Sequence, residues 1–259
     1  MKEITAWWPR NPKPGNMGDI ITPMIIKKIF KKDLLWRNIK GSKKEILIAT
    51  GSIINKASHG NVTVWGSGAM REGDGKQVSS KARILAVRGP VTRDILHSNN
   101  IKVPEVFGDP GLLLPEFFYP KVTKEYEIGI IPHYVDYEEI KAKYEKYPAI
   151  SIIDVLHENP LIPIHQIMKC KRTISSSLHG IIFSNAYNIP SAWVKFSSKL
   201  CGDGAKFKDY FNFCGKELSF IETDFVSPND FDKLFYVTLN DSPYHNNKKL
   251  IEAFKGAYP

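Results

Sequence analysis

The sequence is poor in the features that mark several large classes of protein. Only three of its 259 residues are cysteines, and no two of them form a C-x-x-C pair. This sparse, odd set argues against a disulfide framework and predicts a reducing, cytoplasmic location. No apolar run approaches the roughly 18 residues needed to span a bilayer, and the opening residues do not resemble a signal peptide, so we expect neither a membrane span nor a leader.

Signatures of nucleotide, metal and nucleic-acid sites are also missing. The sequence contains no P-loop, no G-x-G-x-x-G fingerprint and no serine-hydrolase elbow. No group of His, Cys and Asp has metal-ligand spacing. The lysines are spread along the chain, without zinc-finger spacing or an aromatic RNA-binding signature. We therefore predict that the protein uses no metal and no cofactor and binds no nucleic acid.

The charge is strongly of one sign. Lysines and arginines outnumber acidic residues, giving a formal net charge of +9. Such a balance suits a partner with phosphate or carboxylate groups, and charge alone does not choose among nucleic acid, an anionic membrane surface and an acidic small molecule. With 42% hydrophobic residues, the chain can bury one large core or two domains of about 120 residues each. We prefer two domains.

Short apolar, β-branched runs alternate with amphipathic stretches, which is typical of an α/β protein with parallel sheets. We predict strands at 4–8, 45–50, 62–65, 84–87, 103–107, 127–131, 149–153, 172–174 and 191–196. We predict helices at 20–31, 90–98, 164–169, 179–188, 206–213, 229–237 and 246–255. The rhythm breaks near 115–126, which predicts a domain boundary there. Most strands end in glycine or a small polar residue, so these loops should line one crevice.

The run from Ser175 to Gly180 is the strongest candidate for a site. Serines at the end of a predicted strand place His179 at the N-terminus of a predicted helix, where unpaired backbone N–H groups favour the binding of an anion. A histidine there can bind an anionic substrate or donate a proton near neutral pH. The alternative is a structural histidine that caps its helix.

Six short motifs occur in order along the chain and together resemble the polysaccharide pyruvyl transferase family. They are Asn16-x-Gly18-Asp19, Trp65-Gly66-Ser67-Gly68, Val87-Arg88-Gly89-Pro90-x-Thr92-Arg93, Gly108-Asp109-Pro110-Gly111, Ile131-Pro132-His133-Tyr134 and Ser177-Leu178-His179-Gly180. The stretch 202–211 further resembles the bacterial exopolysaccharide ketal-pyruvate transferases.

The resemblance implies two Rossmann-like domains in a GT-B-like arrangement with the active site in the interdomain cleft. Residues 1–120 would form the acceptor side and residues 121–225 the donor side. A helical segment at 226–259 would pack back on the first domain. The implied enzyme moves the enolpyruvyl group of phosphoenolpyruvate, a co-substrate, onto two sugar hydroxyls, forming a cyclic pyruvate ketal. Its acceptor would be a bacterial surface polysaccharide or a lipid-linked precursor, met at the anionic inner membrane.

This chemistry needs a cation for the donor, an acid for its methylene carbon and a base for the acceptor hydroxyl. We assign these catalytic roles to Arg88, His179 and Asp19. The predicted donor-binding residues are Arg88, Arg93, Ser176, Ser177, His179, Gly180, His133, Lys206 and Lys208. The predicted acceptor-binding residues are Asn16, Gly18, Asp19, Gly66, Ser67, Gly68 and Asp109.

Ser177 departs from the family pattern, because many members have arginine there. Binding of the phosphate or carboxylate of phosphoenolpyruvate would then depend on backbone N–H groups or on Arg88, Arg93, Lys206 or Lys208. Structural readings stay open for Asp19 as a helix N-cap and for Asp109 as a turn residue. Two other functions also stay open: a GT-B-type glycosyltransferase that uses a nucleotide sugar, and a non-catalytic carbohydrate-binding or assembly protein.

Overall fold

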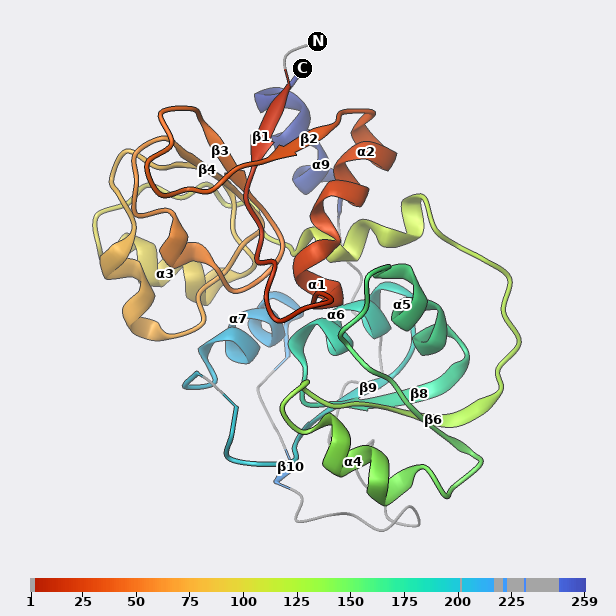
Figure 1. Cartoon of the computed structure of the whole chain (residues 1–259). Helices are drawn as coiled ribbons and strands as arrows, with labels where there is room; N and C mark the ends of the chain where they lie inside the picture. Colours follow the sequence, from red (N-terminus) through yellow and green to blue (C-terminus); the bar gives the residue numbers. More distant parts are fainter. Residues whose placement is uncertain (1–2, 201, 217–220, 223–230, 232–246) are drawn as a thin grey trace.

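The computed structural model describes residues 3–200, 202–216, 221–222, 231 and 247–259, and is built on two parallel β-sheets (Figure 1). The first sheet has the order β2-β1-β3-β4-β5. Its strands are β1 (Ile4–Ala6), β2 (Leu34–Trp36), β3 (Ile46–Ile48), β4 (Val62–Trp65) and β5 (Arg83–Ala86). β1, β3 and β4 are buried throughout, as expected for parallel strands covered on both faces.

The second sheet repeats this design in the following part of the chain. Its order is β10-β9-β8-β6-β7, again with every pair parallel. The strands are β6 (Tyr126–Ile131), β7 (Ile150–Ile152), β8 (Cys170–Ser175), β9 (Ser191–Lys195) and β10 (Ile221–Glu222). The predicted mixed α/β class with parallel sheets is therefore confirmed.

Helices connect the strands and cover the sheets (Figure 1). The α-helices are α1 (Met17–Ile20), α2 (Thr22–Phe30), α3 (Pro90–His97), α4 (Tyr137–Tyr144), α5 (Leu161–Met168), α6 (Leu178–Ala186), α7 (Ala205–Phe213) and α9 (Asn247–Ala257). The 3-10 helices are η1 (Ile54–Lys56), η2 (Glu72–Gln77) and η3 (Pro110–Glu116). None of the helices described is long and apolar enough to cross a bilayer.

Some predicted elements differ from the observed ones. Residues 103–107 form no strand and contribute only an isolated bridge from Phe107 to Val87, because Pro104 lacks the N–H that a strand needs. β2 and α4 were not predicted. The predicted helix 229–237 lies outside the described residues, apart from Phe231.

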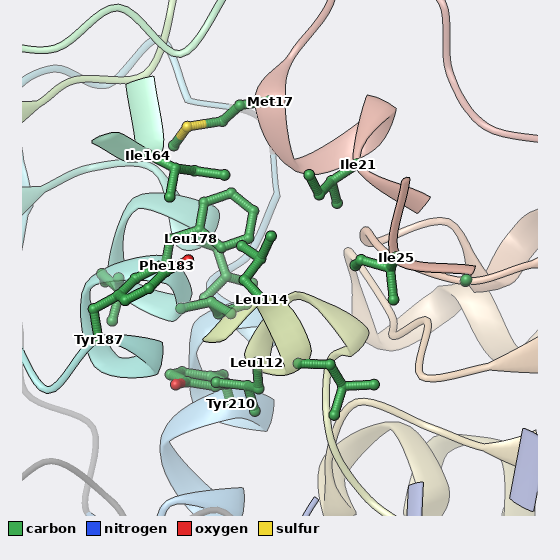
Figure 2. Packing of buried hydrophobic residues seen from close by; sticks show 14 of the residues in the cluster. Met17, Ile21, Ile25, Leu112, Leu114, Ile164, Leu178, Phe183, Tyr187 and Tyr210 are labelled. Atoms are coloured by element: carbon green, nitrogen blue, oxygen red, sulfur yellow. The ribbon is translucent and has the colours of Figure 1, made fainter. Parts of the chain in front are cut away.

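The two sheets share one hydrophobic cluster. Figure 2 shows side chains of α1 and α2 facing those of η3, α6 and α7 across the junction. The labelled members are Met17, Ile21, Ile25, Leu112, Leu114, Ile164, Leu178, Phe183, Tyr187 and Tyr210. Close packing of this kind fixes α1 and η3 against the N-terminal end of α6.

The C-terminal helix α9 lies against the first sheet. The Trp65 ring packs against both Phe30 and Phe254, with centroid distances of 5.6 and 4.8 Å, and the two phenylalanine rings also contact each other. Its indole N–H donates to the Leu250 carbonyl at 2.8 Å. Trp65 is thus a fully buried core residue.

Candidate active site

Five ionisable side chains gather where the two halves of the molecule meet, and we call them the acid–base cluster: Asp19, Asp109, His133, His179 and Lys206. Asp19 lies on α1 and Asp109 begins η3, both from the first half. His133 follows β6, His179 lies in the first turn of α6, and Lys206 lies in the first turn of α7. Both halves therefore contribute to one site.

The loop before α1 is anchored on the second half. Met17 N donates to the Val155 carbonyl at 2.8 Å, and His157 N donates to the Gly15 carbonyl at 2.9 Å. Asn16 is the N-cap of α1, and its side chain accepts from Gly18 N at 3.0 Å. Asn16 therefore shapes the turn that carries Asp19.

Gly18 leaves room for the imidazole of His179. A Cβ added at Gly18 would lie 1.9 Å from His179 Nδ1, so any side chain there would displace the ring. The imidazole also stacks on Phe183, with 5.5 Å between centroids. His179 is held between α1 and its own helix and is 8% exposed.

The serines before His179 hold the strand exit in shape. Ser175 Oγ accepts from Ser177 N at 3.0 Å and lies 2.9 Å from the Ile131 carbonyl. Gly180 packs on the same hydroxyl, since a Cβ there would lie 2.4 Å from it. Ser176 Oγ accepts from His133 N at 2.9 Å. These contacts give the predicted donor-binding residues Ser176, Ser177 and Gly180 a role in positioning the two histidines.

Asp109 faces His179. Its Oδ1 accepts from Gly111 N at 2.8 Å, which makes it the N-cap of η3. Its Oδ2 lies 3.6 Å from His179 Nε2, and neither of these buried atoms has a hydrogen-bond partner within the described part of the chain. At 3.6 Å the pair is too long for a hydrogen bond. The carboxylate and the imidazole therefore face each other without a hydrogen bond between them.

Asp19 ionises less readily than an ordinary aspartate. Burial raises its pKa to about 6; the charges of His179 and Lys206 oppose that rise, and Asp109 adds to it. Its Oδ1 points at Gly51, where a Cβ would lie 3.1 Å away. A carboxylate with this pKa is a stronger base than a solvated one.

Lys206 supplies the positive charge of the cluster. Its side chain is almost fully buried, at 8% exposure. Its charge stabilises ionised Asp19 and, together with burial as the larger cause, lowers the pKa of His133 to about 4. His133 is therefore a neutral imidazole at physiological pH.

Arg88 is placed differently from our expectation. Its guanidinium is fully buried and bonds to Asp209 of α7 at 3.0 Å, to Ser52 at 2.6 Å and to the Ala69 carbonyl at 2.7 Å. Each guanidinium nitrogen therefore has a partner within the protein, where we expected contacts with the substrate. The structure thus makes Arg88 an internal link between the two halves.

Other predicted residues lie apart from the cluster. Arg93 binds Asp94 and Glu105 on the surface of the molecule, and Lys208 is exposed. Gly66, Ser67 and Gly68 are buried, and the Ser67 hydroxyl donates to the Gly51 carbonyl at 2.9 Å. This loop shapes the interior and presents no surface to an acceptor.

Sequence reasoning missed Asp209, the partner of Arg88. Its one local signal is its place three residues after Lys206, which puts both on one face of α7. Among the described residues, no three His, Cys, Asp or Glu side chains are grouped so that they could hold a metal ion. A cavity of about 740 Å³ lies elsewhere, at the amino-terminal edge of the first sheet, and is lined by residues such as Lys32, Lys44 and Tyr258.

Fold and site together define an α/β protein with two parallel sheets and an acid–base cluster at their junction. Residues 10–198 match the family model described as polysaccharide pyruvyl transferase. This match covers most of the chain, and the protein therefore belongs to that family.

The chain is also similar to the uncharacterized protein L143 of Acanthamoeba polyphaga mimivirus. The two are 35% identical over 173 residues, which is 64% of this chain and 59% of the viral protein. The aligned part of the chain thus spans about three fifths of that relative.

Proposed function

We propose that this protein transfers the pyruvyl group of phosphoenolpyruvate to two hydroxyls of a sugar, forming a cyclic ketal and releasing phosphate. The supporting observations are the family and one feature of the site: His179 Nε2 faces Asp109 Oδ2 at 3.6 Å beside Asp19. This arrangement sets an acid and a base side by side at the junction of the two halves.

His179 is the proposed acid. It gives a proton from Nε2, the nitrogen that faces Asp109, to the methylene carbon of phosphoenolpyruvate, which becomes a methyl group. The double-bond electrons form the new C–H bond and leave an oxocarbenium-like centre at the neighbouring carbon. Lys206 pairs with the carboxylate or phosphate of the donor.

Asp19 is the proposed base. It takes the proton of the first sugar hydroxyl as that oxygen bonds to the oxocarbenium carbon. The carbon–oxygen bond to phosphate then breaks with its electrons leaving on phosphate, and the second hydroxyl adds in its place and gives its proton to the departing phosphate. The two protons lost by the hydroxyls equal the two protons gained elsewhere. One of these is in the new methyl group, and the other is on the released phosphate.

The wider setting follows from the same proposal. The two halves act as a GT-B-like pair, with the acceptor on the first half and the donor on the second. The acceptor is a sugar of a surface polysaccharide or its lipid-linked precursor, as in the bacterial branch. The net charge of +9 suits contact with an anionic membrane where that precursor is displayed.

The test compares phosphoenolpyruvate, nucleotide sugars and inorganic phosphate as ligands in thermal unfolding, and then measures phosphate release with a sugar acceptor. We expect phosphoenolpyruvate to raise the midpoint temperature, because at one hundred times its Kd a ligand of the folded state adds about 2.7 kcal/mol to the free energy of unfolding. His179→Gln should lower turnover at least about 100-fold, within the usual range for a general acid. The exposed His97→Gln is the matched control.

A shift with a nucleotide sugar in place of phosphoenolpyruvate would contradict the proposal and favour a glycosyltransferase. Binding of a carbohydrate without turnover, unaffected by His179→Gln, would favour a non-catalytic protein.

A further inference from the structure

The buried ion pair between Arg88 and Asp209 joins the first half of the molecule to α7. Asp209 Oδ2 accepts from Arg88 Nε at 3.0 Å and from Thr92 Oγ1 at 2.7 Å, and its Oδ1 accepts from Thr92 N at 2.8 Å. The two charged side chains are 0% and 1% exposed. Both carboxylate oxygens are therefore satisfied within the protein interior.

The backbone of α7 also packs closely against the first half of the molecule, next to the Arg88–Asp209 pair. A Cβ at Gly89 would lie 2.2 Å from the Asp209 carbonyl oxygen, so only glycine allows the helix to approach the turn between β5 and α3 this closely. At the start of α7, Asp203 Oδ2 accepts from Glu72 N at 3.0 Å. The first half therefore holds α7 at two points.

Lys206 lies between these two anchors. It precedes Asp209 by three residues, so both side chains project from one face of α7. Asp209 points into the Arg88 network, and the Lys206 charge acts on Asp19 and His133. Any shift or rotation of α7 about Asp209 would move Lys206 relative to the acid–base cluster.

We propose that Asp209 is a positioning residue that acts through Lys206. Locked by Arg88 and Thr92, its carboxylate fixes the first turns of α7 and places the ammonium group where the anionic donor binds. The part of this role that concerns the donor rests on the proposed function, whereas the placement of Lys206 by Asp209 does not.

The first variant is Asp209→Asn, which keeps the size of the side chain and removes the charge that faces Arg88. We expect the KM for phosphoenolpyruvate to rise about 10-fold to 100-fold, as a displacement of about 1 Å can produce, with a smaller effect on kcat. Glu139→Gln removes an exposed ion pair with Lys199 and is the matched control. The control should leave both constants unchanged.

A double-variant cycle separates positioning from a general loss of stability. If Asp209 acts through Lys206, then Asp209→Asn added to Lys206→Met should cost almost nothing further in KM. Independent, multiplying effects of the two substitutions would overturn the proposal. Lys171→Met, at an exposed lysine paired with Glu127, controls for the loss of a lysine.

A second readout needs no substrate. The Lys206 charge lowers the pKa of His133, so NMR titration of the His133 imidazole reports where Lys206 lies. Asp209→Asn and Lys206→Met should both raise the pKa of His133. If wild type fails to use phosphoenolpyruvate while this rise occurs, the proposed function falls and the placement stands.

If Asp209→Asn does not fold, the paired variant Arg88→Met with Asp209→Leu replaces it, because an apolar pair leaves no buried charge unpaired. We expect this variant to fold, with the KM and the pKa of His133 still raised. A wild-type KM and a wild-type His133 titration in any folded Asp209 variant would overturn the proposal.

Discussion

At the residue scale, the burial of Asp19 is expected to favour activity and to lower the stability of the folded protein. Its pKa of about 6 in the folded protein exceeds its ordinary value of 3.8, so folding takes up a proton between these values. The free energy of unfolding therefore falls as pH rises through that window, and the loss is complete above about pH 6. A residue kept at such a cost is typical of a functional site.

Asp19→Asn should therefore stabilise the protein at pH 8, by up to about 3 kcal/mol, while activity falls at least about 100-fold. Most of the gain should disappear near pH 4, because the carboxyl is then protonated in the folded state and close to its ordinary pKa of 3.8 in the unfolded state. Denaturant unfolding of wild type and Asp19→Asn at the two pH values measures this gain in the free energy of unfolding. Asp203→Asn is the control: its pKa is lowered, so that variant should gain no stability at pH 8.

The same pKa predicts the pH profile of the wild type. Since Asp19 acts as a base, kcat/KM should fall as pH drops through about 6. An acid limb near pH 4 would contradict its role.

At the scale of elements, the contact of α1 with α6 depends on the absence of a side chain at Gly18. Gly18→Ala would bring a methyl group within 1.9 Å of the present position of His179 Nδ1. We expect the ring to move and turnover to fall by about 10-fold to 100-fold. Gly256→Ala is the control, because a Cβ there meets nothing within 4 Å and α9 should gain a few tenths of a kcal/mol. Equal activity of the two variants would contradict the contact.

At the scale of the whole molecule, the shared hydrophobic cluster makes the two halves depend on each other. Leu114 of η3 is fully buried at the junction with α6 (Figure 2). Leu114→Ala should lower the free energy of unfolding by about 2–5 kcal/mol. Calorimetry should show a single transition, moved to lower temperature. Two separate transitions, with only one of them moved, would contradict this coupling.

Local patterns determined much of the fold from the sequence alone. The β-branched run at Val62–Trp65 is predicted at its observed limits, and Pro90 marks the observed start of α3. These features follow from interactions between near neighbours in the chain. The small residues before His179 likewise predict a strand exit into a helix, which β8 and α6 confirm.

The pairing of charges was decided only by the tertiary structure. Arg88 follows a predicted strand and looks like a ligand for an anion, yet its partner is Asp209, 121 residues away in sequence. His179 and Asp109 meet across the junction of the two halves in the same way. The sequence by itself determined the α/β class, the family and the histidine at the strand exit, because these depend on local order. The pairing of buried charges depends on how the two sheets pack. It is therefore decided only when the whole chain has folded, because the partners are far apart in sequence.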